Sequence, residues 1–186
     1  MITTPTDIDY ALLKRIARGE QAALEELIRR HERRLYQLAY RLLKDPLETE
    51  DALQEVFVKA YEHAHRFQPL STVKAWLNRI TANHCLNRLR ERVPQDSLDD
   101  EDKAPQLSSG EATPLEALEE SDLARRLENL LASLPESQRR ALILKCFGDL
   151  SYQEIAQIME TSPGAVDGLI KRARQFLRKA LADYFE

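Results

Sequence analysis

The sequence predicts an all-α protein of two small helical domains joined by an acidic flexible linker, and three observations lead to this prediction. The 186 residues include only 5 glycines and 6% aromatics while 31% are charged, which is typical of helical rather than all-β proteins. Apolar residues recur at helical spacing on both sides of one stretch that lacks this periodicity. No segment shows the alternation of a strand between turn signals.

The N-terminal part, residues 1–92, is expected to hold four helices. A short first helix ends near Gly19, and Asp45-Pro46 closes the second helix and opens the third. Ser71 is the expected N-cap of the fourth helix, which Pro94 stops. The apolar stripes of the last three helices are Leu24, Leu27, Ile28, Leu35, Leu38, Ala39 and Leu42; Leu53, Val56, Phe57, Ala60, Tyr61 and Ala64; and Val73, Trp76, Leu77 and Ile80.

The middle of the chain reads as a linker. Residues 93–122 carry a net charge of −9, with three prolines and four serines, and most of them show no apolar periodicity. Such a composition self-repels and is typical of a flexible segment. We therefore assign residues 93–120 to an acidic linker and residues 121–186 to a second domain.

The second domain is predicted to contain a helix-turn-helix. A fifth helix carries the stripe from Leu123 to Leu134, and after Pro135 a sixth helix ends at Gly148 as its C-cap. The pattern 151–154, S-x-x-E, is a capping box that opens a short seventh helix. A tight turn at residues 161–164 then leads to a last helix, and the small Ala156 suits the crossing of the two helices.

The last helix is basic. Up to Leu181 its local charge is +4, because Asp167 stands against five lysines and arginines. Arginines on such a helix can meet phosphates and read guanine edges in the major groove. A solvated charged face on an ordinary bundle helix is the alternative, but the capping box and the turn before the helix favour DNA.

The fourth helix pairs an apolar face with amides and cations. Asn83 and Asn87 can bond base edges and the arginines can hold a backbone, so these residues with Phe67 could hold unstacked bases. Trp76 lies on the apolar stripe, so a place in the hydrophobic core is favoured over a role in base binding. Phe67 lies in the loop, and for this residue both roles stay open.

Several classes of protein are disfavoured. The longest aliphatic run has four residues and the N-terminus has no export signal, so a cytoplasmic protein without membrane insertion is expected. Cys85 and Cys146 lack metal or redox spacing and read as small apolar side chains. Glu62 and His65 form the single E-x-x-H pair, where a di-iron bundle needs two, so neither catalytic residues, nor a metal, nor another cofactor is predicted.

Three stretches in order resemble the extracytoplasmic-function (ECF) sigma factors, which belong to the sigma-70 family of bacterial RNA polymerase specificity subunits. They are LETEDALQEVFVKAYEHAHRF at 47–67, STVKAWLNRITANHCLNRLRER at 71–92, and the 48 residues from Leu134 to Leu181. The resemblance implies a non-catalytic alternative sigma factor that directs core RNA polymerase to specific promoters, promotes melting of the −10 element, and is controlled by an anti-sigma factor. It implies contacts with the clamp helices of the largest polymerase subunit and the flap of the second largest.

The resemblance also implies roles for individual residues. Core-polymerase binding falls on Glu50, Asp51, Gln54 and Glu55. Binding of the −10 element falls on Phe67, Ser71, Lys74, Arg79, Asn83, Asn87 and Arg88. Binding of the −35 element falls on Ser162, Ala165, Asp167, Gly168, Lys171, Arg172, Arg174 and Arg178. The run from Ala165 to Leu169 departs from the family pattern, because many relatives have threonine, then lysine or arginine, then serine and arginine at the start of this helix. Asp167 cannot contact phosphate but can accept a hydrogen bond from a cytosine amine.

The distribution of charge agrees with this division of labour. Residues 45–67 carry −4, which suits a basic protein surface, and residues 68–92 carry +4, which suits promoter DNA. An autonomous helix-turn-helix regulator remains an alternative, and it predicts tight binding of the free protein to a two-fold duplex site.

Overall fold

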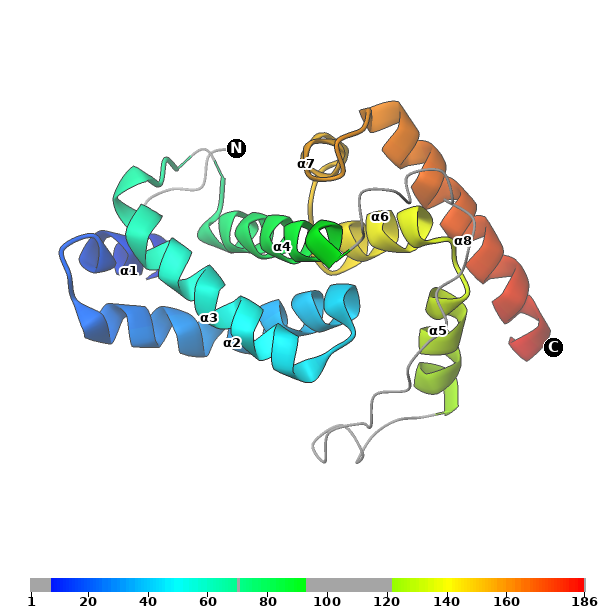
Figure 1. The fold of residues 1–186 in the computed structure, drawn as a ribbon, viewed down its shortest axis with the longest axis horizontal. Coiled ribbons are helices and arrows are strands. Elements are labelled where there is room, and N and C mark those ends of the chain that lie inside the picture. Colours follow the sequence, from blue (N-terminus) through cyan, green and yellow to red (C-terminus); the bar gives the residue numbers. More distant parts are fainter. Residues whose placement is uncertain (1–7, 70, 93–121, 186) are drawn as a thin grey trace.

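The computed structural model describes residues 8–69, 71–92 and 122–185. Within these ranges the chain forms eight α-helices and one 3-10 turn, without a strand, which confirms the all-α prediction (Figure 1). The predicted acidic linker lies outside the described residues. The elements are α1 (Ile8–Ile16), α2 (Gln21–Leu43), α3 (Pro46–His63), η1 (Ala64–Arg66), α4 (Val73–Arg92), α5 (Asp122–Ala132), α6 (Glu136–Cys146), α7 (Tyr152–Ile158) and α8 (Pro163–Phe185).

Two helix starts confirm their sequence signals. Asp45 caps α3 by accepting a hydrogen bond from the Glu48 amide at 2.9 Å, and Pro46 occupies the first turn. At the start of α7 the Ser151 hydroxyl accepts from the Glu154 amide, and the Glu154 carboxylate accepts from the Ser151 amide. These reciprocal bonds place the helix-turn-helix where the sequence predicts it.

Three local predictions are wrong. Thr72 rather than Ser71 caps α4, because its hydroxyl accepts from the Ala75 amide at 3.1 Å. The tight turn is shorter than predicted, since α8 already begins at Pro163 and Ser162 caps it. Gly148 does not adopt the left-handed conformation, which falls on the next residue, Asp149, at φ 55°. Glycine is still required at 148, because a Cβ there would lie 2.6 Å from the Leu144 carbonyl oxygen.

The first hydrophobic core lies among α1, α2, α3 and α4. Leu27, Leu35, Val56 and Leu77 are almost fully buried at its centre, as their spacing predicts. A polar contact not foreseen from the sequence ties α1 to α2. The Asp9 carboxylate accepts from Arg30 at 2.7 Å and bonds the His31 ring at 2.8 Å. This bond explains how the buried positions Asp9 and His31 are tolerated.

The second core joins the two halves of the chain. The end of α2 and the middle of α4 contribute to the same cluster as α6, α7 and α8. α4 contacts α7, which lies above the end of α4 in Figure 1, and α2 contacts α6. At this boundary the Asn78 amide, 1% exposed, donates to the Gly148 carbonyl at 2.7 Å. The two predicted domains are therefore packed against each other in this structure.

The two cysteines differ. Cys85 is buried in the second core, and burial raises the pKa of its thiol to about 12, so it behaves as the predicted small apolar side chain. Cys146 is exposed at the end of α6, which the sequence interpretation did not anticipate.

Candidate functional site

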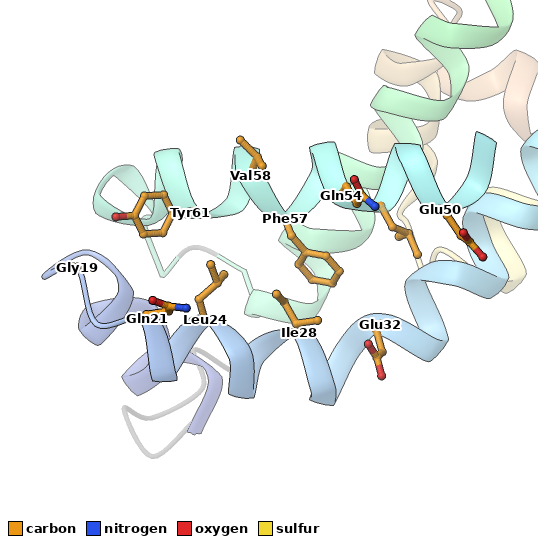
Figure 2. Close-up of a pocket in the computed structure, with 11 residues that line it drawn as sticks. Gly19, Gln21, Leu24, Ile28, Glu32, Glu50, Gln54, Phe57, Val58 and Tyr61 are labelled. Carbon is orange, nitrogen blue, oxygen red and sulfur yellow. The ribbon is translucent and has the colours of Figure 1, made fainter. Parts of the chain in front are cut away.

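An acidic and apolar groove runs between α2 and α3. Of the four residues predicted to bind core polymerase, Glu50 and Gln54 line it, while Asp51 is exposed outside it. Figure 2 shows Ile28 and Phe57 facing each other across the groove, whose volume is about 840 Å³. The lining residues that sequence reasoning missed as functional are Gly19, Gln21, Leu24, Ile28, Glu32, Leu53, Phe57, Val58 and Tyr61.

The chemistry of the groove fits a basic amphipathic helix. Val58 and Tyr61 line the groove and are 56% and 47% exposed, so they present apolar surface to solvent there. Glu32 and Glu50 add carboxylates to the lining. An apolar floor with acidic side chains complements a helix that carries apolar residues on one face and lysines or arginines beside them.

A second cavity, of about 340 Å³, brings together the predicted promoter residues Phe67, Asn83 and Asn87. The Phe67 ring lies edge-on to the Trp76 ring, with 5.3 Å between the centroids. Trp76 is half-buried and also lines the cavity, so it serves both the core and the pocket. The further lining residues are Lys59, His63, Arg66, Ile80 and His84.

Four other residues predicted to contact the −10 element do not line this cavity. Lys74 lies 3.6 Å from Asp149, and Arg79 donates to the Gln157 side chain of α7 at 2.7 Å, so both contact the C-terminal half. Arg88 faces α3 instead. Ser71 is exposed in the loop before α4.

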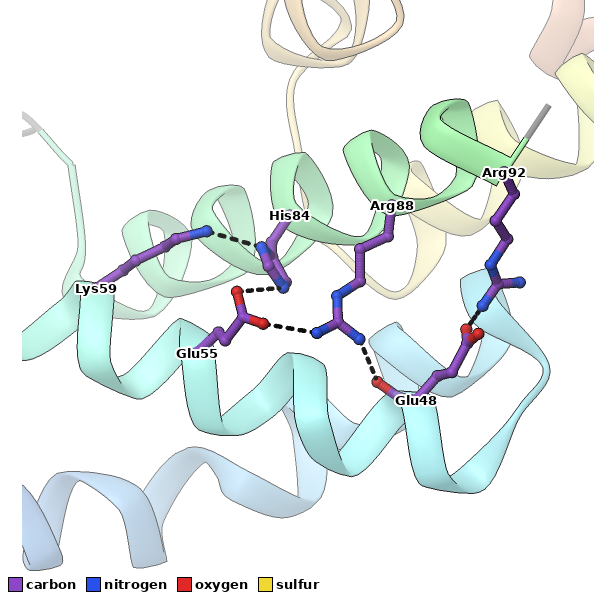
Figure 3. A network of polar contacts seen from close by, with 6 residues as sticks. All are labelled: Glu48, Glu55, Lys59, His84, Arg88 and Arg92. Atoms are coloured by element: carbon purple, nitrogen blue, oxygen red, sulfur yellow. Dashed lines mark hydrogen bonds and ion pairs between the residues drawn. The ribbon is translucent and has the colours of Figure 1, made fainter. Parts of the chain in front are cut away.

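A polar network connects α3 with α4 (Figure 3). The Lys59 ammonium lies 2.7 Å from Nδ1 of His84, and Nε2 of the same ring lies 3.4 Å from the Glu55 carboxylate. Arg88 donates to the other oxygen of Glu55 at 2.6 Å. Glu48 pairs with Arg92 at the end of the network. Glu55, predicted to bind polymerase, is therefore engaged within the chain.

The network shifts two pKa values. The hydrogen bond from Arg88 holds the pKa of Glu55 below its ordinary value, assisted by the positive charge of Lys59. Burial, together with the charge of Lys59, lowers the pKa of His84. His84 is therefore neutral at pH 7, and Nδ1 accepts the hydrogen bond because a lysine ammonium can only donate.

The predicted −35 residues share one side of α8. Lys171, Arg172, Arg174 and Arg178 are exposed, while Val166, Ile170 and Ala173 are buried on the opposite side. Asp167 pairs with Lys171 at 2.7 Å, and this contact raises the pKa of Lys171. Ala165 is exposed and Gly168 half-exposed near the start of the helix, where Ser162 is engaged as the cap.

The single E-x-x-H pair of the sequence lies at the surface. Glu62 and His65 are exposed, and no group of three or more histidine, cysteine or acidic side chains that could hold a metal occurs among the described residues. Within the same ranges none of the helices has the length and apolar character needed to cross a membrane.

Comparisons with known proteins identify the class. The family model for sigma-70 region 2 matches residues 27–93, and the model for sigma-70 region 4 matches residues 124–177. The chain belongs to the sigma-70 family. Within that family it is an ECF sigma factor. It is 30% identical to SigW of Bacillus subtilis over 92% of this chain and 95% of SigW, and 33% identical to the sigma-H factor of Pseudomonas aeruginosa over 93% of each.

A longer relative and two solved structures agree with this membership. SigE of Mycolicibacterium smegmatis is 37% identical to this chain over 174 residues, which are 90% of this chain and 66% of SigE. The structure of CnrH in complex with the cytosolic domain of CnrY is similar, with a TM-score of 0.62, 27% identity, and coverage of 97% of this chain and 100% of CnrH. RpoE of Bartonella quintana, in complex with the anti-sigma factor NepR, has a TM-score of 0.61, 25% identity, and coverage of 85% and 96%.

Proposed function

We propose that this chain is a non-catalytic subunit that directs core RNA polymerase to specific promoters and opens their −10 elements. The observation that carries the proposal is the pocket beside α4, which is lined by the rings of Phe67 and Trp76 and by the side chains of Asn83 and Asn87. Aromatic rings accept an unstacked base, and side-chain amides bond its Watson–Crick edge. Such a pocket serves a protein that holds single-stranded rather than duplex DNA.

The α2–α3 groove is proposed as the docking site for core polymerase. Its apolar floor and the carboxylates of Glu32 and Glu50 fit the clamp helices of the largest subunit better than they fit DNA. Asp51 adds a further exposed negative charge on α3. The groove extends the core-binding prediction from α3 alone to both helices.

The exposed basic side of α8 is proposed to read the −35 element, and contact with the flap of the second-largest subunit would hold this half in place. In the free chain, Lys74 and Arg79 are occupied by contacts with the C-terminal half. We therefore propose that core polymerase separates the two halves, so that these cations become available to promoter DNA.

An anti-sigma factor is the proposed regulator, because the similar protein RpoE of Bartonella quintana is in complex with the anti-sigma factor NepR. We place the chain in the cytoplasm, on the nucleoid when bound to polymerase and at the membrane when a membrane-attached anti-sigma factor holds it.

Transcription in vitro tests the proposal. Core polymerase and genomic DNA from the bacterium that encodes the chain are incubated with and without it, and transcript 5′ ends are sequenced. We expect a small set of start sites that depend on the chain and share −10 and −35 elements. Start sites that do not change, together with failure of the chain to co-elute with core, would refute it. Tight binding to duplex DNA without polymerase would instead support the autonomous regulator.

A further inference from the structure

Lys59 brings a positive charge to the wall of the promoter pocket. It projects from α3, whereas the predicted −10 residues come from α4 and the preceding loop, and it lines the same cavity as Asn83 and Asn87. A lysine ammonium has three N–H donors, and His84 takes one of them at 2.7 Å. Two donors are left for a ligand in the cavity.

His84 fixes the position of this ammonium. Its side chain is 9% exposed, and Nδ1 accepts from Lys59, so the ring proton resides on Nε2. Nε2 faces the Glu55 carboxylate at 3.4 Å but makes no hydrogen bond within the described residues. The carboxylate thus favours the Nε2–H form, and this form keeps Nδ1 free to accept from Lys59.

Glu55 is held in turn by Arg88 at 2.6 Å. The contacts therefore run from Arg88 to Glu55, then to His84 and Lys59 (Figure 3). Lys59, at the end of this series, lines the pocket. A flexible lysine loses much side-chain entropy when it binds alone, and a partner that holds it beforehand reduces that loss.

We propose that Lys59 is a specificity-determining residue that donates to an acceptor atom on the edge of the captured −10 base, and that His84 and Glu55 are its positioning residues. This inference rests on the proposed function, because it concerns the same pocket. It assigns to α3 a part in promoter reading beside its part in polymerase docking. Bases that present an acceptor atom to Lys59 are bound well, and bases that present an amine there are rejected.

The test uses holoenzyme assembled from core polymerase and the full chain, on single-stranded oligonucleotides of the non-template −10 element from a mapped promoter. At each position in turn the four bases are compared, which locates the captured base. We expect Lys59→Ala to flatten the preference at that position by roughly ten-fold, the size expected for one hydrogen bond from a charged donor. Arg33→Ala, which removes the same charge from an exposed site on α2, is the matched control and leaves the preference unchanged.

Two substitutions of His84 separate positioning from folding. His84→Asn retains an oxygen near the position of Nδ1 and should keep the base preference, whereas His84→Leu fills the site without an acceptor and should reproduce the effect of Lys59→Ala. Adding Lys59→Ala to His84→Leu should cause no further loss, since both act through one contact. Thermal unfolding of each variant identifies any that fail to fold.

Nitrogen-15 spectra of His84 in the free chain supply a readout that does not depend on a promoter. We expect the Nε2–H tautomer. Finding the Nδ1–H tautomer would overturn the proposed positioning of Lys59 by His84, whether or not the chain acts as a sigma factor. If the wild-type holoenzyme transcribes but Lys59→Ala weakens the binding of oligonucleotides with all four bases equally, Lys59 contacts the DNA backbone and the specificity proposal fails. If the wild type yields no promoter at all, the proposed function fails and this inference fails with it.

Discussion

Replacing Asn78 with alanine should loosen the contact between the two halves of the free chain. The Asn78 amide is almost completely buried and donates to the Gly148 carbonyl at 2.7 Å. Its loss leaves a buried carbonyl without this bond, which costs about 1–3 kcal/mol. The Asn78 oxygen is itself buried without a partner, and removing it offsets part of that penalty. We therefore expect a net loss of about 1–2 kcal/mol.

Urea unfolding of the free chain, followed by circular dichroism, measures this loss. Asn83→Ala is the matched control, because Asn83 lies on the same helix but is exposed, and its free energy of unfolding should change by less than about 0.5 kcal/mol. The affinity for core polymerase should not fall in Asn78→Ala, since core is proposed to separate the halves. Equal unfolding free energies for Asn78→Ala and the wild type would refute the packed arrangement.

Three further predictions concern the groove, α8 and the polar network. Val58→Asp should weaken binding to core polymerase at least ten-fold in a fluorescence titration, because it places a charge in the apolar groove. Leu47, which is 75% exposed on the same helix but lies outside the groove, supplies the control, and Leu47→Asp should not weaken binding. Equal effects of the two substitutions would contradict the docking site. Arg172→Ala should weaken holoenzyme binding to the −35 element by about 1–3 kcal/mol if Arg172 reads a base, and an unchanged affinity would remove it from the interface. Because the pKa of His84 is lowered in the folded chain, the unfolded chain binds a proton more readily as the pH falls through 6.5, so the free energy of unfolding should fall between pH 7 and pH 5. The free energy of unfolding of the His84→Asn variant should fall less over this range, and an identical pH dependence in the variant and the wild type would contradict the assignment.

Periodic and local signals were sufficient to predict the helices. The spacing of Leu27 and Leu35 identified a face that is indeed buried, and the capping residues Asp45 and Ser151 marked helix starts that the structure confirms. These predictions succeed because they depend on residues within one or two turns of each other. The wrong cap at Ser71 shows the limit, since Thr72 beside it is chemically equivalent and the choice depends on backbone geometry.

The site was predicted only in part, because its contacts join distant segments. Phe67, Asn83 and Asn87 do share one pocket, which their residue types suggested. The engagement of Glu55 by Arg88 depends instead on how α3 packs on α4, and nothing in the spacing of either helix indicates it. Arg79 likewise contacts α7, which is 78 residues further along the chain. A helix pattern predicts a buried face but not its partner.

Opening of the −10 element by holoenzymes that differ only at Asn83 tests the central claim most directly. Core polymerase is saturated with the wild-type chain or with Asn83→Ala, and permanganate reactivity of the −10 thymines is measured on a promoter mapped as above. The account predicts equal core binding and a marked loss of reactive thymines in Asn83→Ala, since Asn83 lines the pocket and lies outside the docking groove. Undiminished opening with Asn83→Ala would contradict the assignment of this pocket to the promoter.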